Sequence, residues 1–134
     1  MKSEDDPFNP QIWLSRARSN LNLAEAGQHI QDVFLEDLCF EAQQAAEKAL
    51  KAICIHLELD FTKTHSLTIL MDTIEAGGVP IPDAVREAAI LTQYAVRTRY
   101  PGAIEPVDLE EYQTSLVLAS RVLVWAEKVV GGKA

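Results

Sequence analysis

The sequence predicts an all-α protein, an up-and-down helical bundle of about five helices. Apolar residues recur with helical spacing in five segments, and capping or helix-stopping residues stand at the ends of those segments. No alternating apolar and polar pattern of useful length indicates a strand. The chain has 134 residues, which suffices for one domain with its own core. We therefore expect a single domain over residues 1–134, with a flexible N-terminus over residues 1–8.

The first predicted helix begins at Asn9-Pro10, an N-cap followed by a proline at the first helical position, and runs to about Gly27. Its apolar face comprises Trp13, Ala17, Leu21 and Ala24.

The second predicted helix runs from about Asp32 to Leu59 and carries two apolar stripes. The first stripe comprises Leu35, Leu38, Ala42, Ala45, Ala49 and Ala52, and the second comprises Cys39, Ala46, Leu50, Ile53 and Leu57. A helix with two apolar stripes needs cover on two sides, so we place it at the centre of the bundle. Its surplus apolar surface also predicts contact with a second copy of the chain. The narrow polar edge comprises Glu41, Gln44, Lys48, Lys51 and Glu58, and Glu47 precedes Lys51 by one helical turn as a stabilising pair.

Three further helices follow. Ser66 is the predicted cap of a helix whose apolar face comprises Leu67, Leu70, Met71 and Ile74, and Gly77-Gly78 ends it. Pro80 and Pro82 bracket the start of the next helix, which continues to about Arg99 with Val85, Ala88, Ala89, Thr92 and Val96 on its apolar face. Asp108 and Glu111 form a capping-box pattern before the last helix, whose apolar positions are Leu109, Tyr112, Leu116, Ala119, Leu123, Ala126 and Val130.

The composition narrows the function classes. The net charge of −8 disfavours general nucleic-acid binding, which depends on neutralising phosphates, although a local basic patch could hold a nucleotide or a short RNA. No apolar run is long enough to cross a bilayer, and the acidic first residues do not form a signal peptide, so we expect a cytoplasmic protein without membrane contact.

Cys39 and Cys54 fall on one helix, about 22 Å apart, beyond disulfide reach. We interpret them as small buried hydrophobes and expect no metal and no cofactor.

Two segments could bind an anion. Residues 94–102 bring Arg97, Arg99 and Tyr100 to the end of a helix, where guanidinium groups suit phosphate and a tyrosine ring suits a base. The alternative is that both arginines complement the negative helix end. Residues 63–66 place His65 at a helix N-terminus, where backbone N–H groups favour anions. The alternative there is ordinary capping by Ser66, with His65 bonded to a neighbouring helix. Gly-rich phosphate loops and nucleophile elbows are absent from the sequence.

Four segments in order resemble the HEPN domain family, named for higher eukaryotes and prokaryotes nucleotide-binding. They are the helix over residues 39–52, the segment over residues 63–67, the turn over residues 97–101, and the closing helix with residues 119–125. The resemblance covers nearly the whole chain. It implies an up-and-down helical bundle, a homodimer, and a cleft used for a nucleotide or RNA. It further implies a possible minimal nucleotidyltransferase partner, since many small prokaryotic members of such families are encoded with one. Some of these pairs act as toxin and antitoxin.

The chain departs from the RNase members of the family, which carry an Arg and a His with four to six residues between them. The residues at that distance after Arg97 are Gly102, Ala103 and Ile104, and those after Arg99 are Ile104, Glu105 and Pro106. A metal-independent RNase needs a group that transfers protons near neutral pH, and histidine is the usual one. The sequence therefore favours a non-catalytic nucleotide-binding or nucleotidyltransferase-partner module, with Arg97, Arg99, Tyr100 and His65 bordering one cleft. The alternatives are an RNase toxin in which His65 replaces the missing histidine, and an interaction scaffold without a small ligand.

Overall fold

The computed structural model describes residues 6–97 and 106–132, and these residues form helices and turns without any strand. The predicted all-α bundle is confirmed. The long helices are α1 (Pro10–Ala26), α2 (Leu35–His56), α3 (Leu67–Ala76) and α6 (Leu109–Gly131), and a short 3₁₀ turn, η1 (Gly27–His29), extends α1. Residues 83–97 form a composite segment of α4 (Asp83–Arg86), the 3₁₀ helix η2 (Glu87–Thr92) and α5 (Gln93–Arg97).

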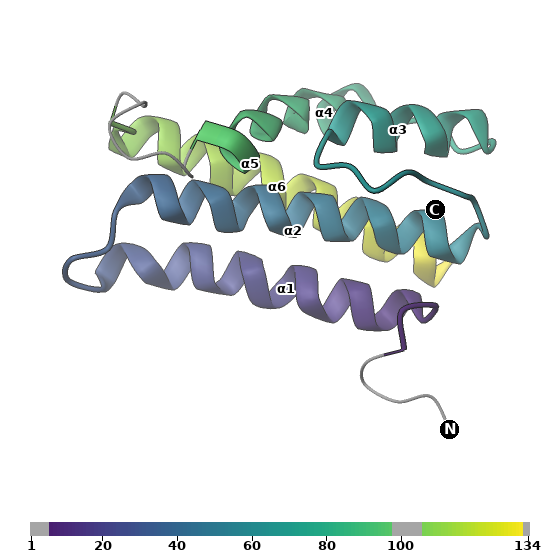
Figure 1. The fold of residues 1–134 in the computed structure, drawn as a ribbon, viewed down its shortest axis with the longest axis horizontal. Coiled ribbons are helices and arrows are strands. Elements are labelled where there is room, and N and C mark those ends of the chain that lie inside the picture. Colours follow the sequence, from purple (N-terminus) through teal and green to yellow (C-terminus); the bar gives the residue numbers. More distant parts are fainter. Residues whose placement is uncertain (1–5, 98–105, 133–134) are drawn as a thin grey trace.

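Helix α2 is the centre of the bundle. It runs antiparallel to α1 on one side, while α3 and residues 83–97 cover it on the other side, with α6 behind it (Figure 1). Ala42, Ala46, Ala49 and Ile53, which represent both predicted apolar stripes, are fully buried within the single chain. The inference that α2 keeps spare apolar surface for a second copy is therefore wrong, because α1, α6 and α3 already cover it.

Side-chain caps begin three of the long helices, as the sequence predicts. Asn9 Oδ1 accepts from the Gln11 N–H at 3.0 Å, Ser66 Oγ from the Ile69 N–H at 3.3 Å, and Asp108 Oδ1 from the Glu111 N–H at 2.7 Å. Helix α2 begins later than predicted, at Leu35, because Asp32 adopts a left-handed conformation with φ of 65°. Such a residue interrupts a right-handed helix.

Helix α1 ends where the sequence predicts, although Gly27 has a role other than a left-handed cap. Its φ is −61°, an ordinary right-handed value. A Cβ atom at this position would lie 2.2 Å from Leu38 Cδ2 in α2. The glycine therefore allows the end of α1 to lie close against the start of α2.

Residues 83–97 differ from the regular α-helix that the sequence predicts. Val85, Ala88, Leu91 and Tyr94 are buried, and each follows the last by three residues, while Ala95 is buried next to Tyr94. A 3₁₀ helix has three residues per turn, so this spacing keeps the four side chains on one face through η2. An α-helical period predicted Val96 in the core instead, whereas its side chain is 61% exposed.

Helix α6 packs through a face slightly rotated from the predicted one. Tyr112, Ala119, Leu123 and Ala126 are buried as expected, whereas Leu109 is 55% exposed. Ser115, Leu118 and Val122 join the core instead. The rotated face follows from the neighbours of α6, since both α2 and η2 pack against it.

Candidate functional site

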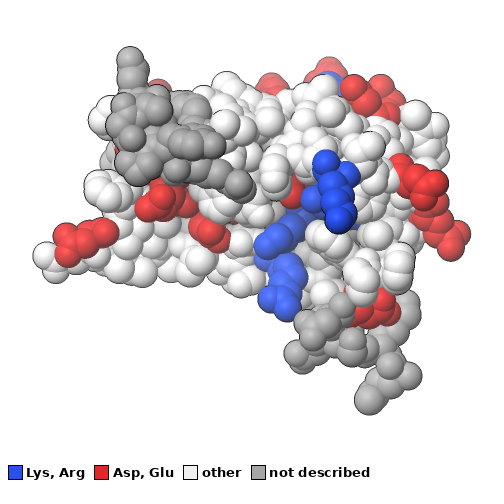
Figure 2. Space-filling view, in the orientation of Figure 1, with Lys and Arg blue, Asp and Glu red and all other residues white. Residues whose placement is uncertain are grey.

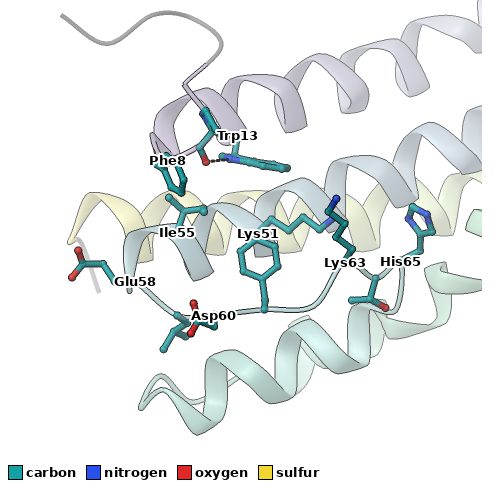
Figure 3. A pocket seen from close by; sticks show the side chains of 12 residues that line it. Phe8, Trp13, Lys51, Ile55, Glu58, Asp60, Lys63 and His65 are labelled. Carbon is teal, nitrogen blue, oxygen red and sulfur yellow. Dashed lines mark hydrogen bonds between the residues drawn. The ribbon is translucent and has the colours of Figure 1, made fainter.

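A pocket of about 880 Å³ lies where the start of α1, the second half of α2 and the loop after α2 meet (Figure 3). The loop over residues 57–66 folds back along α2 (Figure 1), and residues of this loop form one wall of the pocket. Its far end is held by two hydrogen bonds: the Leu67 N–H donates to Thr92 Oγ1 at 3.1 Å, and the Ser66 N–H donates to Thr64 Oγ1 at 3.0 Å. The lining residues are Pro7, Phe8, Trp13, Lys51, Ile55, Glu58, Leu59, Asp60, Phe61, Lys63, Thr64 and His65.

One part of the pocket is aromatic. Phe8 comes from the segment before α1, Trp13 from the first turn of α1, and Phe61 from the loop. Trp13 Nε1 donates a hydrogen bond of 2.8 Å to the carbonyl of Pro7, which fixes the indole ring (Figure 3). Pro7 and Phe8, which the sequence assigned to a flexible N-terminus, therefore form part of this wall. Flat rings of this kind offer stacking faces to a base.

The other part of the pocket is charged. Lys51 reaches in from α2, and Lys63 and His65 come from the loop (Figure 3). The Lys51 ammonium lies 5.9 Å from the centroid of the Trp13 ring, so the aromatic and cationic parts adjoin. Glu58 and Asp60 supply carboxylates at the same pocket. The arrangement suits a ligand with an aromatic body and an anionic group.

Basic side chains also extend from this pocket over α1 and α2. Figure 2 shows lysine and arginine side chains in one stripe across this face, with acidic side chains mostly towards the edges of the view. Arg16 and Lys51 both interact electrostatically with Lys48, whose pKa is lowered chiefly by its burial. Lys48 Nζ donates to Asn20 Oδ1 at 2.8 Å, and Asn20 Nδ2 donates to Glu41 Oε1 at 2.8 Å. These hydrogen bonds join α1 to α2 within the stripe of basic side chains.

Glu47 lies beneath the charged part of the pocket and is only 4% exposed. Its Oε2 accepts from Lys51 Nζ at 2.8 Å, and its Oε1 is 2.9 Å from His65 Nδ1. Burial alone raises the pKa of Glu47, but hydrogen bonds from Lys51, Gln43 and His65 outweigh it and lower the pKa overall. Glu47 is therefore an ionised carboxylate that joins α2 to the loop.

Gln43 holds both the Glu47 carboxylate and the backbone of His65 in place. Its Nε2 donates to Glu47 Oε1 at 3.0 Å and to the His65 carbonyl at 3.3 Å, while its Oε1 accepts from Gln44 Nε2 at 2.7 Å. Neither Gln43 nor Glu47 is predicted from the sequence as a site residue. The only signal was the spacing of Gln43, Glu47 and Lys51, which puts three polar groups in line along a helix.

Of the four site residues predicted from the sequence, His65 lies in this pocket. Arg99 and Tyr100 lie outside the described residues, as does the side chain of Arg97, the last residue of α5. The prediction that all four border one cleft therefore remains a prediction. Tyr94, from the same segment, is 3% exposed and donates its hydroxyl to Glu111, so it packs in the core and offers no stacking face.

The other candidates stay outside the pocket. Cys39 and Cys54 are buried free thiols, as predicted, and burial raises the pKa of Cys54 to about 11. His29 and His56 are exposed. Within residues 6–97 and 106–132, no group of three metal-ligating side chains is found. In the same part of the chain, no helix combines the length and the apolar character needed to cross a bilayer.

Comparison with known proteins agrees with the architecture. The family model of the HEPN domain matches residues 10–129. The chain belongs to the HEPN domain family. A crystal structure of an archaeal HEPN homologue aligns with a TM-score of 0.70 at 22% identity, covering 91% of this chain and 98% of that one. At this identity the likeness shows the shared fold. No curated protein shows significant sequence similarity to this HEPN chain.

Proposed function

We propose that this chain is a single-domain, non-catalytic HEPN module that binds a nucleotide in the pocket between α1, α2 and the loop after α2. The observation that carries the proposal is the meeting of Trp13 and Phe61 with Lys51 and Lys63 in one pocket of an acidic chain. Aromatic faces would hold the base, and the ammonium groups would meet the phosphates.

Lys63 and Lys51 have different parts in this proposal. Lys51 already donates to Glu47, so its charge is partly neutralised by that carboxylate. Lys63 is exposed and has no ion-pair partner among the described residues. Lys63 is therefore the cation most available to a phosphate.

Calorimetric titration with a panel of adenine and guanine nucleotides tests the proposal. Lys63→Ala should weaken binding about tenfold, and Phe61→Ala should weaken it by a similar factor. Lys128→Ala removes a lysine from the last turn of α6 that does not line the pocket, and it should leave the affinity unchanged. Equal affinities for the wild type and for Lys63→Ala would contradict the proposal.

Arg97, Arg99 and Tyr100 are proposed to border the ligand together with His65, as the family resemblance implies. Arg99→Ala should then weaken nucleotide binding by about 1.5–3 kcal/mol, the value of a charged hydrogen bond, with unchanged helical content. Added salt should reproduce part of the loss. An affinity equal to that of the wild type would leave the arginines as complements of the helix end.

The family resemblance also supports a cytoplasmic homodimer and, as a possible partner, a minimal nucleotidyltransferase. Exposed apolar side chains on η2 and α6, namely Ile90, Val117 and Val124, offer surface that a protein partner would cover. In sedimentation experiments at micromolar concentration, Val117→Asp should shift a dimer towards monomer. Leu23→Asp, a matched change at an exposed position in α1, should not. A wild type that is only monomeric would count against the homodimer.

The pairing of His65 with Glu47 favours one second candidate, the RNase toxin. A carboxylate that holds an imidazole is a common arrangement for general-base catalysis. Purified protein should not cleave RNA if the module is non-catalytic. Efficient cleavage that His65→Ala abolishes would replace the binding module with the toxin.

A further inference from the structure

Glu47 accepts hydrogen bonds from Gln43, Lys51 and His65, and the His65 atom that faces it is Nδ1. Because the Glu47 carboxylate is ionised and can only accept, the His65 Nδ1 atom 2.9 Å away must carry a proton. This holds for the neutral and for the charged imidazole. The remaining ring nitrogen, Nε2, then accepts a hydrogen bond when the ring is neutral and donates one when it is protonated.

The His65 ring is accessible on its other side. The side chain is 53% exposed, whereas that of Glu47 is 5% exposed. His65 also lines the pocket together with Lys51 and Lys63. Its backbone is held by Gln43 Nε2, which donates to the His65 carbonyl at 3.3 Å. The imidazole is thus fixed at Nδ1 and at its backbone, and His65 lines the pocket with its exposed side (Figure 3).

We infer that Glu47 is the positioning residue of the pocket and that His65 Nε2 contacts the phosphate of the bound ligand, donating a hydrogen bond in the protonated state. The inference rests on the proposed nucleotide function. A phosphate seated between Lys63 and His65 meets an ammonium group on one side and the imidazole Nε2 on the other.

The charged groups around His65 come from α2 and from the loop after it. Lys51, Lys63, Glu58 and Asp60 share the pocket, and Glu47 lies beneath it. The first turn of α3 and Thr92 of η2, which meet the loop beside His65, carry no charge.

The first test needs no ligand. Nitrogen-15 NMR of the imidazole in the free protein at high pH should show His65 as the Nδ1–H tautomer. Replacement of the acceptor in Glu47→Leu should remove this preference. An Nε2–H tautomer in the wild type, or an unchanged tautomer in Glu47→Leu, would overturn the positioning role of Glu47.

The second test measures affinity. The probe is a dinucleoside monophosphate, and calorimetric titration gives its dissociation constant. His65→Asn keeps a donor for Glu47 but lacks Nε2, so it should bind the probe about tenfold more weakly than the wild type.

The matched control is His29→Asn, which removes an exposed histidine at the opposite end of α1 and should retain the wild-type affinity. An unchanged affinity in His65→Asn would overturn the role of Nε2. Failure of the wild type to bind any nucleotide would remove the proposed function and the phosphate contact together. The tautomer measurement would then still decide whether Glu47 positions His65.

Discussion

The hydroxyl of Tyr112 in α6 donates a hydrogen bond of 2.5 Å to the carbonyl oxygen of Ala24, in the last turn of α1. Tyr112 is fully buried, and the Glu25 carbonyl lies 3.4 Å from the same hydroxyl. The last carbonyls of a helix have no partner within the helix. Tyr112 therefore supplies, from a distant part of the chain, a donor that the end of α1 lacks.

Tyr112→Phe should lower the free energy of unfolding by about 1–3 kcal/mol, because it leaves a buried carbonyl without its donor. Urea denaturation followed by circular dichroism measures the change. Thr114→Val, at an exposed position on the same helix, should change the stability by less than about 0.5 kcal/mol. A Tyr112→Phe protein as stable as the wild type would show that water replaces the hydroxyl.

Ala46→Leu tests the close packing of α2. Ala46 is fully buried, so the larger side chain should overpack the core and cost about 1–3 kcal/mol of unfolding free energy. Gln113→Leu introduces the same side chain at an exposed position of α6 and serves as the control. Equal stability of Ala46→Leu and the wild type would indicate that the core has room at this position.

Glu58 and Gly78 occupy equivalent positions after two helices. The Leu59 N–H donates to the Cys54 carbonyl, and the Val79 N–H donates to the Ile74 carbonyl, in the same helix-ending motif. Glu58 has φ of 56° and Gly78 has φ of 105°. Glycine adopts such angles without strain, whereas other residues are disfavoured.

Glu58→Gly should therefore raise the free energy of unfolding by about 0.5–1 kcal/mol, as relief of backbone strain outweighs the greater freedom of the unfolded chain. Gly78→Ala should lower the free energy of unfolding by a similar amount. The cost comes from the positive φ alone, because an added Cβ meets no atom within 4 Å. Thermal and urea denaturation measure both variants. Loss of stability in Glu58→Gly would instead indicate that the Glu58 side chain stabilises the pocket wall.

Glu47 should make stability depend on pH in the acidic range. Its pKa in the folded protein lies below the ordinary value of 4.5, so its contribution is complete above about pH 4.5 and is lost as the pH falls through the folded pKa. Glu47→Gln should lower the free energy of unfolding by about 1.5–3 kcal/mol at pH 7. The difference between the two proteins should shrink below pH 4.5, as urea denaturation at a series of pH values would show. A constant difference would mean that Glu47 contributes through packing alone.

Local signals in the sequence determined the helices and most of the core. The caps at Asn9, Ser66 and Asp108 act on N–H groups two or three residues away, so the nearby sequence contains all the information they need. The apolar face of α3 was predicted in full for the same reason, since Leu67, Leu70, Met71 and Ile74 follow one helical period and are all buried. These features depend on neighbours along the chain.

Only the tertiary structure decided the rest. Leu91 and Tyr94 enter the core because η2 adopts the tighter 3₁₀ period against α6, and no local pattern separates that period from an α-helix. Glu47 reads as one half of a surface ion pair with Lys51, yet the loop after α2 folds back and buries it beneath His65. The helices follow from interactions a few residues apart, whereas burial and the contacts of the pocket arise between segments that meet only when the chain folds.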